Sequence, residues 1–580
     1  MKKSIILNMK KLIGLFFINI IFLTSIFSQV INDSQVIEGK HWIYKAMNTL
    51  ALESKKGIFT ANTPVTAGEL KIHFREFDRE MLSDSGKKLY DKAEEYLFSE
   101  ENLFPVEMFK AGLGIKLAPE LCYKSNEQID WIYNYYYKDN PISAQLDLGI
   151  SQYFCMGGNY FIGKNWKYSH KSDNFTNLPL DFNQYEFEYP RFAYGSTGYF
   201  GENWGINAHL GKEGLTIGNT ATGSIIYNNT FETAGYFQLT AFCNDVKYTM
   251  NVAEIQPEKF LYWHQIDVRL FDKLKLGAME GALINRSFEI RFLNPMMVYH
   301  SFAFWKNYTS EEEDHYYNEG YCCSYLGLTF EYNPVRYLRL YGLYAMNEMQ
   351  LPNELVGRYR AYPDSFGGQL GAELTVPSAA GGYWHSALEG VYCSPYLYIK
   401  QAPGWSLYKE RADNNDIGGE TINSWIGTPF GPDTLAVDLQ FGYEQTEKWN
   451  AGLEYLLCFK GEKDFGLFDK KNFNHHDYDK KEKHHEIDVW DYYPYTKYII
   501  AKDNGDDSEC DAAVEDGRRK WMSGCCQTKH QIGLEGGYSF TENIRLQGQV
   551  IYSFVINTQH IPGNFQHGVQ CALSAEFKLF

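Results

Sequence analysis

The sequence predicts an all-β transmembrane barrel of about 16–18 antiparallel strands, preceded by a small α-helical domain. The mean hydropathy is −0.40, yet aromatic residues make up 17% of the chain, with 45 Tyr and 39 Phe. A barrel reconciles these facts, because its strands turn apolar residues to lipid and polar residues to the lumen, and aromatic residues gather at the membrane interfaces. The third observation is that apolar and polar residues alternate with period two in many short segments.

Residues 1–28 predict a cleaved signal peptide. The basic stretch "MKKSIILNMKK" precedes the apolar run "LIGLFFINIIFLTSIF", and cleavage is expected after Ser28. The alternative is a retained membrane anchor, but this run contains Asn19 and is shorter than the ~20 apolar residues that a spanning helix needs. We therefore expect export to the outer membrane of a diderm bacterium.

Residues 29–104 predict three short amphipathic helices. They lie in "HWIYKAMNTLALES", in "TPVTAGELKIHFREF", where Thr66 and Glu69 have the spacing of a capping box, and in "SGKKLYDKAEEYLF". Their position before the first strand predicts a periplasmic helical domain. The alternative, three helices packed into the barrel mouth as a plug, stays open at this point.

Residues 105–580 predict the barrel. In the strand that follows "TEN", Ile544, Leu546 and Val550 share one phase, and Arg545 and Gln547 share the other. Five tight hairpins repeat this design, with turns at "FDK", "NPVR", "PSAAGG", "EQTEK" and "TEN". Together with the C-terminal strand they give eleven strands from about Phe260 onward, and the preceding stretch has room for about five to seven more.

The connections between these hairpins are long, and one of them, at about residues 461–529, approaches seventy residues. Short turns on the periplasmic side and long loops outside are typical of a transmembrane barrel, whereas a sandwich or propeller has no reason to place every short turn at one end. The segment 461–529 is therefore predicted to be an extracellular loop. We expect outer-membrane lipid and the barrel assembly machinery as partners.

The C-terminal segment "CALSAEFKLF" alternates as a last strand should, and its terminal aromatic residue resembles the signal that such barrels present for assembly. Phe580, however, is in the phase of Glu576 and Lys578 rather than of the apolar residues. We predict a bulge or frayed end near Lys578 that turns Phe580 to the membrane interface.

The long loop contains the candidate ligand and metal residues. Aromatic rings beside charged groups form surfaces on which sugars stack, although a tyrosine-rich loop can equally pack on itself. The candidate ligand-binding residues are Trp490, Asp491, Tyr492, Tyr493, Tyr495 and Lys497. Two histidine pairs form a weaker metal candidate, because their spacing matches no closed site and a solvated charged loop is the simpler explanation. These residues are His475, His476, His484 and His485.

The segments "TPVTAGEL", "GLTIGNTATGSIIYNN", "YWHQIDVRLFDKLKLGAMEGALINRSFEIRFLNPMMVY" and "WIGTPFGPDTL" resemble the Wzi capsule-assembly family of outer-membrane proteins, over most of the chain. The resemblance implies an eighteen-stranded barrel with a periplasmic helical bundle, and a surface lectin that holds capsular polysaccharide at the cell exterior. The residues that match the family pattern are His264, Glu280, Arg286, Asn294, Pro295 and Asp433. The loop from Gly461 to Lys529 and the high cysteine content depart from the family.

The sequence also predicts a structural role for three of these matching residues. Glu280 and Arg286 are expected to pair across a plugged lumen, where a charge-assisted contact is favourable. His264 falls in the lipid-facing phase, so that it lies in the interface band or at a bulge.

The cysteine count is eleven, so at least one thiol is unpaired or pairs with another molecule. A disulfide between Cys510 and Cys525 or Cys526 would close a loop of about fifteen residues, worth roughly 3 kcal/mol in the chain-entropy model. Cys571 has the phase of a small apolar residue.

The sequence contains no GxSxG, Walker, HExxH or CxxC motif, so neither an enzyme nor a cofactor is predicted. The net charge of −18 argues against nucleic acid as a partner. The favoured function is non-catalytic, lectin-like binding or organisation of surface polysaccharide. The alternatives are a porin-like diffusion channel, and an adhesin or outer-membrane enzyme that acts through the long loop.

Overall fold

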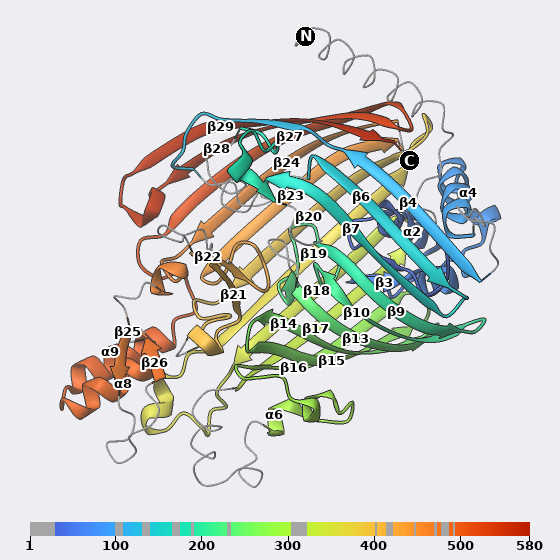
Figure 1. The fold of residues 1–580 in the computed structure, drawn as a ribbon. Coiled ribbons are helices and arrows are strands. Elements are labelled where there is room, and N and C mark those ends of the chain that lie inside the picture. Colours follow the sequence, from blue (N-terminus) through green and yellow to red (C-terminus); the bar gives the residue numbers. More distant parts are fainter. Residues whose placement is uncertain are drawn as a thin grey trace, which may run out of the picture.

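A computed structural model of the chain describes most of its residues. The described ranges are 30–98, 108–129, 140–164, 175–186, 191–228, 234–302, 322–400, 403–412, 421–445, 448–468, 473–476, 487–490 and 493–579. The predicted signal peptide and Phe580 lie outside them. Within these ranges, eighteen antiparallel strands form a closed barrel, as the sequence predicts (Figure 1).

The first half of the wall begins with an interrupted strand, because β4 and β5 both pair with the last strand, β29, and thereby close the barrel. The elements are β4 (Phe109–Leu117), β5 (Glu120–Lys124), β6 (Ile142–Ile150), β7 (Phe154–Lys164), β8 (Tyr185–Glu186), β9 (Phe192–Phe200), β10 (Trp204–Glu213), β13 (Ala234–Cys243), β14 (Val246–Gln256), β15 (Lys259–Leu270) and β16 (Leu274–Ile284). The short strand β8 pairs only with the end of β7.

The second half of the wall consists of longer strands. They are β17 (Cys322–Val335), β18 (Leu338–Glu348), β19 (Ser365–Pro377), β20 (Tyr383–Cys393), β23 (Thr434–Gln445), β24 (Trp449–Lys460), β27 (Gln527–Thr541), β28 (Ile544–Ile556) and β29 (Phe565–Lys578). All five predicted hairpins are present: β15–β16, β17–β18, β19–β20, β23–β24 and β27–β28. One connection departs from strict alternation, because only Pro257 and Glu258 join β14 to β15 at the end of the barrel that otherwise carries the long connections.

The outer face is apolar and carries aromatic rings near both ends of the strands. Trp384 stacks on Phe441 at a centroid distance of 5.5 Å near the short turns, and His530 stacks on Phe554 at 4.4 Å near the long connections. These rings correspond to the two interface girdles of a membrane barrel. The ladder of β29 is regular to Lys578, which pairs with Lys116, so the predicted bulge is not present up to that residue.

The three predicted helices are α2 (Trp42–Ser54), α3 (Ala67–Phe74) and α4 (Asp84–Phe98), accompanied by β1 (Val36–Ile37), β3 (Val65–Thr66) and the 3₁₀ turn η1 (Arg79–Met81). Met47, Leu50, Leu70 and Leu97 are fully buried in their shared core. The predicted capping box at the start of α3 does not form. Thr66 makes no side-chain cap, and the carboxylate of Glu69, which would complete the box, accepts a hydrogen bond from the barrel residue Lys247.

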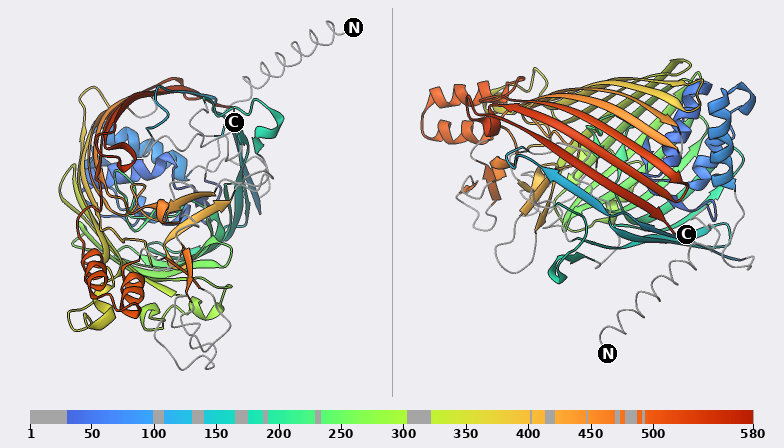
Figure 2. Two further views of the ribbon diagram at one scale, coloured as in Figure 1. Left: turned by 90° about the vertical axis from the view of Figure 1, so that its left-hand side faces the viewer. Right: turned by 90° about the horizontal axis from the view of Figure 1, so that it is seen from above.

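This helical segment, residues 30–98, contacts the inner face of the wall at the short-turn end (Figure 2). The Arg269 guanidinium donates to Glu76 at 2.6 Å, the Lys275 ammonium donates to the carbonyl of Ile58 at 2.6 Å, and Lys247 pairs with Glu69. None of the described helices is long and apolar enough to cross a membrane. The periplasmic placement of this end of the barrel stays a prediction.

The buried pair of Lys247 and Glu69 is expected to contribute most to holding the helical segment against the barrel wall, because both side chains are only 1% exposed. Lys247→Met leaves a buried carboxylate without its partner, and we expect a loss of about 3–5 kcal/mol in the free energy of unfolding. Lys45→Met breaks a pair with Glu444 in which the lysine is 61% exposed, and should cost less than about 1 kcal/mol. Urea unfolding in detergent micelles, followed by the helical circular dichroism signal, measures both; equal effects would contradict the prediction.

Candidate functional site

The connection between β10 and β13 folds into the lumen. Its described part, residues 214–228, is termed the lumen loop, and it contains β11 (Thr216–Ile217) and β12 (Tyr227–Asn228). Both strands belong to a small sheet with β2 (Asn62–Thr63) of the helical segment. The apolar residues Ile217, Ile225 and Ile226 are at most 3% exposed. The stretch "GLTIGNTATGSIIYN", residues 214–228, therefore joins the helical segment to the barrel interior.

Glu389 on β20 anchors the lumen loop. Its carboxylate accepts hydrogen bonds from the backbone N–H groups of Ala221 at 2.9 Å and Thr222 at 3.1 Å, and from the Thr222 hydroxyl. The Tyr341 hydroxyl at 2.6 Å and the Gln369 amide at 2.8 Å donate to the same carboxylate from the neighbouring strands. Five donors thus compensate the cost of burying a carboxylate that is 1% exposed.

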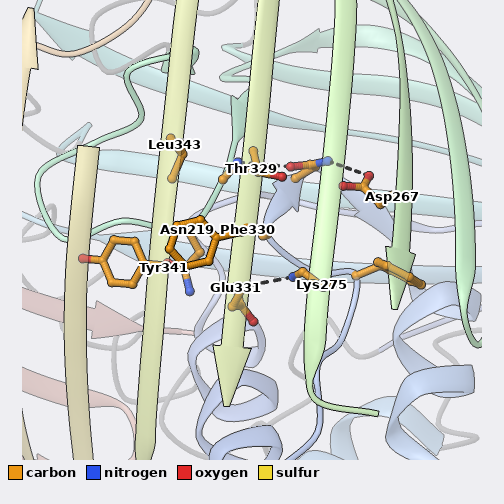
Figure 3. Close-up of a pocket in the computed structure, with 12 residues that line it drawn as sticks. Asn219, Asp267, Lys275, Thr329, Phe330, Glu331, Tyr341 and Leu343 are labelled. Carbon is orange, nitrogen blue, oxygen red and sulfur yellow. Dashed lines mark hydrogen bonds and ion pairs between the residues drawn. The ribbon is translucent and has the colours of Figure 1, made fainter. Parts of the chain in front are cut away.

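A cavity of about 20 Å³ lies where the lumen loop, the helical segment and the wall meet (Figure 3). Its polar lining includes Asn62, which donates to Asp267 at 3.4 Å, and Lys275, which donates to Glu331 at 3.4 Å. This volume has room for about one water molecule and is far too small for a sugar ring. The cavity is a small gap left where these three parts pack together, rather than a ligand pocket.

The connection between β20 and β23 covers the lumen loop at the long-connection end. It includes the 3₁₀ turn η6 (Pro403–Trp405) and the hairpin of β21 (Tyr408–Ala412) with β22 (Thr421–Trp425). The hydroxyls of Tyr398 and Tyr325 donate to the carbonyls of Ile225 and Ile226. The described residues therefore fill one side of the lumen, whereas the lumen-facing Glu535 and Gln547 on β27 and β28 stay exposed.

Asp433, at the end of the "GTPFGPD" motif, holds the base of the long loop. Its side chain accepts hydrogen bonds from the backbone N–H groups of Ser523 and Lys463 at 3.1 Å each, and from the Ser523 hydroxyl. Burial raises the pKa of this carboxyl, although the bonds from Ser523 and Lys463 oppose the shift. The role of Asp433 is therefore to connect two segments at the long-connection end of the barrel.

The long loop contains the 3₁₀ turn η7 (Phe465–Phe468), β25 (Phe473–His476), β26 (Ile487–Trp490), α8 (Pro494–Asp503) and α9 (Asp507–Gly517). Tyr493 and Tyr495 are 1% and 5% exposed, and Lys497 is half-buried. The side chain of Trp490 and the whole of Asp491 and Tyr492 lie outside the described residues. The structure thus places two of the predicted ligand residues in the interior.

An exposed aromatic surface lies beside these buried tyrosines. Tyr495 stacks on Tyr362 at 4.2 Å, and Tyr359, on the 3₁₀ turn η5 (Gly357–Ala361), stacks on Tyr362 at 6.0 Å and on Tyr495 at 6.5 Å. Tyr359 is 42% exposed and is followed by the exposed Arg360. This turn cannot be recognised from the sequence, because its "RYR" pattern becomes informative only when the distant Tyr495 is packed against it. We call Tyr359, Arg360, Tyr362 and Tyr495 the tyrosine platform.

The predicted metal residues remain untested. His475 and His476 lie on β25, whose side chains are not described, and His484 and His485 lie outside the described residues. Elsewhere in the described ranges no group of three His, Cys, Asp or Glu side chains is arranged to hold a metal ion. Cys510, Cys525 and Cys526 are free thiols, so the predicted disulfide is not formed.

Glu280 does not face the lumen, contrary to the sequence prediction. Its neighbours Met279 and Gly281 point inward, and Met279 lies in the lumen core, so Glu280 projects from the outer face of β16. There its carboxylate contacts the His264 ring at 3.1 Å and accepts the backbone N–H of His300 at 2.9 Å. The outward phase predicted for His264 is correct. Arg286 follows β16 in the chain and is not a lumen residue of that strand.

Comparison with known proteins gives a likeness of fold. No family model and no curated protein sequence matches the chain. Among solved structures, the chain is similar to Wzi of Escherichia coli, described as an outer-membrane protein involved in group 1 capsule assembly and a carbohydrate-binding β-barrel, with a TM-score of 0.54 and 9% identity over 93% of this chain and 99% of that one. OprD of Pseudomonas aeruginosa matches with a TM-score of 0.36 and 10% identity over 81% and 96%. The fold is that of an outer-membrane barrel.

The anchoring role of Glu389 predicts a local effect on the lumen loop. Glu389→Ala leaves buried N–H groups unsatisfied, at about 1–3 kcal/mol each. We expect the amides of Ala221 and Thr222 to exchange with solvent at least about tenfold faster in hydrogen–deuterium exchange, since about 1.4 kcal/mol corresponds to a factor of ten. Glu354→Ala, which removes an exposed loop carboxylate, is the control. Unchanged exchange in the Glu389 variant would contradict the anchoring role.

Proposed function

We propose that this chain is an outer-membrane carbohydrate-binding barrel that holds a surface polysaccharide at the cell exterior and catalyses no reaction. The likeness to Wzi supports this proposal because it extends over nearly the whole of both chains. The observation that supports it is the aromatic surface at the long-connection end: α8 and α9 pack on η5, which places Tyr359 on the tyrosine platform.

The tyrosine platform has the properties that sugar recognition needs. Tyr495 and Tyr362 are packed ring on ring beneath Tyr359, so little side-chain entropy is lost when a ligand stacks on the exposed ring. Arg360 supplies hydrogen-bond donors for hydroxyl or carboxylate groups at the edge of the platform. In this proposal Tyr493 and Tyr495 act as supports, and Trp490, Asp491, Tyr492 and Lys497 stay the further ligand-binding residues predicted from the sequence.

The charge of the chain restricts the glycan. With a net charge of −18, the protein repels a strongly anionic polysaccharide unless local basic groups or bridging cations intervene. A neutral polysaccharide is therefore the favoured ligand class.

The test is binding of the full-length chain, in detergent micelles, to an array of neutral and acidic bacterial polysaccharides. We expect Tyr359→Ala to weaken binding about two- to twelvefold, because an aromatic contact contributes about 0.5–1.5 kcal/mol and about 1.4 kcal/mol corresponds to a factor of ten. Tyr359→Phe, which keeps the ring, should bind like the parent protein. Absence of binding to every polysaccharide would refute the function, whereas binding that is insensitive to Tyr359→Ala would refute only the site.

A porin-like channel is the second candidate, and one observation favours it. Glu535 and Gln547 project from β27 and β28 into the lumen and are exposed, so part of the lumen is lined by solvated polar groups among the described residues. Conductance in planar bilayers separates the two candidates, because a lectin with a filled lumen should show no steady channels.

A further inference from the structure

A segment between β16 and β17 lies on the outside of the barrel. Residues 286–300, here termed the outer strap, include the 3₁₀ turn η3 (Ile290–Leu293) and lead into α6 (Tyr299–Phe302), which is drawn beside β15 and β16 in Figure 1. Phe292 and Tyr299 of the strap form a core with outward-facing residues of the wall. As a result Tyr262 and Ala282 are at most 1% exposed, whereas the outward-facing Ile266, two positions beyond His264 on β15, is 52% exposed.

The wall holds the outer strap with polar groups from three consecutive strands. The Tyr248 hydroxyl of β14 donates to the carbonyl of Pro295 at 3.0 Å, and the Tyr262 hydroxyl of β15 accepts the backbone N–H of Glu289 at 3.2 Å. Glu280 of β16 accepts the backbone N–H of His300. Polar residues are expensive on the lipid-facing wall of a barrel, so their presence needs a partner, and the strap backbone supplies it.

Many of the backbone N–H and carbonyl groups of the strap are hydrogen-bonded within the strap itself. The N–H groups of Phe292 and Met297 donate to the carbonyls of Glu289 and Asn294, and the Met296 N–H donates to the Asn294 side chain at 3.1 Å. The Tyr299 hydroxyl donates to the carbonyl of Phe292 at 2.7 Å. Irregular backbone is tolerated at membrane depth only when its polar groups are paired in this way.

The exposed side chains of the strap are mostly apolar, although Ser287, Asn294 and His300 are exposed as well. Phe288, Ile290, Met296 and Val298 are 50%, 79%, 86% and 55% exposed. These four large side chains continue the apolar surface of the neighbouring wall, where Ile266 and Leu276 are 52% and 43% exposed. In water such a group would form an unfavourable exposed patch, whereas against hydrocarbon it matches its surroundings.

We propose that the outer strap is a lipid-contact surface, in which Ile290 and Met296 lie among the acyl chains of the membrane while Tyr248, Tyr262 and Glu280 fix the strap to the wall. In this region the lipid therefore meets an extracellular connection rather than the barrel strands. The occupant of the surface is membrane lipid; a second copy of the chain is the competing outcome.

A photoreactive benzophenone amino acid at position 296 tests the contact in the full-length protein, reconstituted in phosphatidylcholine vesicles. The control places the same group at Val356, which is 62% exposed on the connection between β18 and β19. After irradiation, mass spectrometry should find phospholipid adducts at least fivefold more often at position 296 than at position 356. Equal yields, or a crosslinked dimer at position 296 in place of lipid adducts, would overturn the proposal.

The fixing groups are tested separately by trypsin, which cleaves after Arg286 and Arg291 of the strap. In the same vesicles, the combined variant Tyr248→Phe and Glu280→Ala removes two fixing groups, and cleavage at these two sites should be about tenfold faster than in the parent. Tyr538→Phe changes an outward-facing tyrosine far from the strap and should leave the rate unchanged. Equal rates in the combined variant and the parent would show that these groups do not hold the strap.

Discussion

The closure of the sheet is the constraint on which the rest of the structure depends. Within a membrane no water can pair with a free strand edge, so β29 must meet the beginning of the wall, and it does so through both β4 and β5. Closure fixes which residues face lipid and which face the lumen, because neighbouring side chains alternate along every strand. The polar residues that this alternation places in the lumen then need partners, which are either other segments of the chain or water.

One side of the lumen is filled by chain segments that bring partners for its charged groups. The helical segment supplies Glu69 and Glu76 for Lys247 and Arg269, and the lumen loop supplies backbone N–H groups for Glu389. Each of these contacts joins residues more than 120 positions apart in the sequence. Burial of a charge is thereby coupled to correct assembly of the parts, because an unpaired charge at any of these places would be costly.

This coupling also explains how much the sequence could predict. The alternation of "IRLQGQVIYSF" is local, so strands, hairpins and the barrel itself were predictable, as were the three helices and the outward phase of His264. The lumen loop was not predictable, because Ile225 and Ile226 are apolar residues whose burial depends on Tyr398 and Tyr325, distant in sequence. The capping box failed for the same reason: Glu69 has the right spacing for the N-terminus of α3, but Lys247 offers a stronger, charged partner.

Glu280 breaks the alternation of apolar and polar residues along its strand, and this exception points to a structural feature that the alternation itself does not reveal. The sequence prediction places this carboxylate in the lumen, where a charge-assisted pair with Arg286 is favourable, but it lies in the outward phase of β16. Its true position requires a covering segment, and the outer strap provides it through His300 while the His264 ring lies on the other side of the carboxylate. The same reasoning applies to Tyr248 and Tyr262, whose hydroxyls each contact strap backbone. A segment folded back over the wall is therefore indicated when polar groups recur at neighbouring outward positions of consecutive barrel strands. This pattern can be recognised once it is known which residues of each strand face outward.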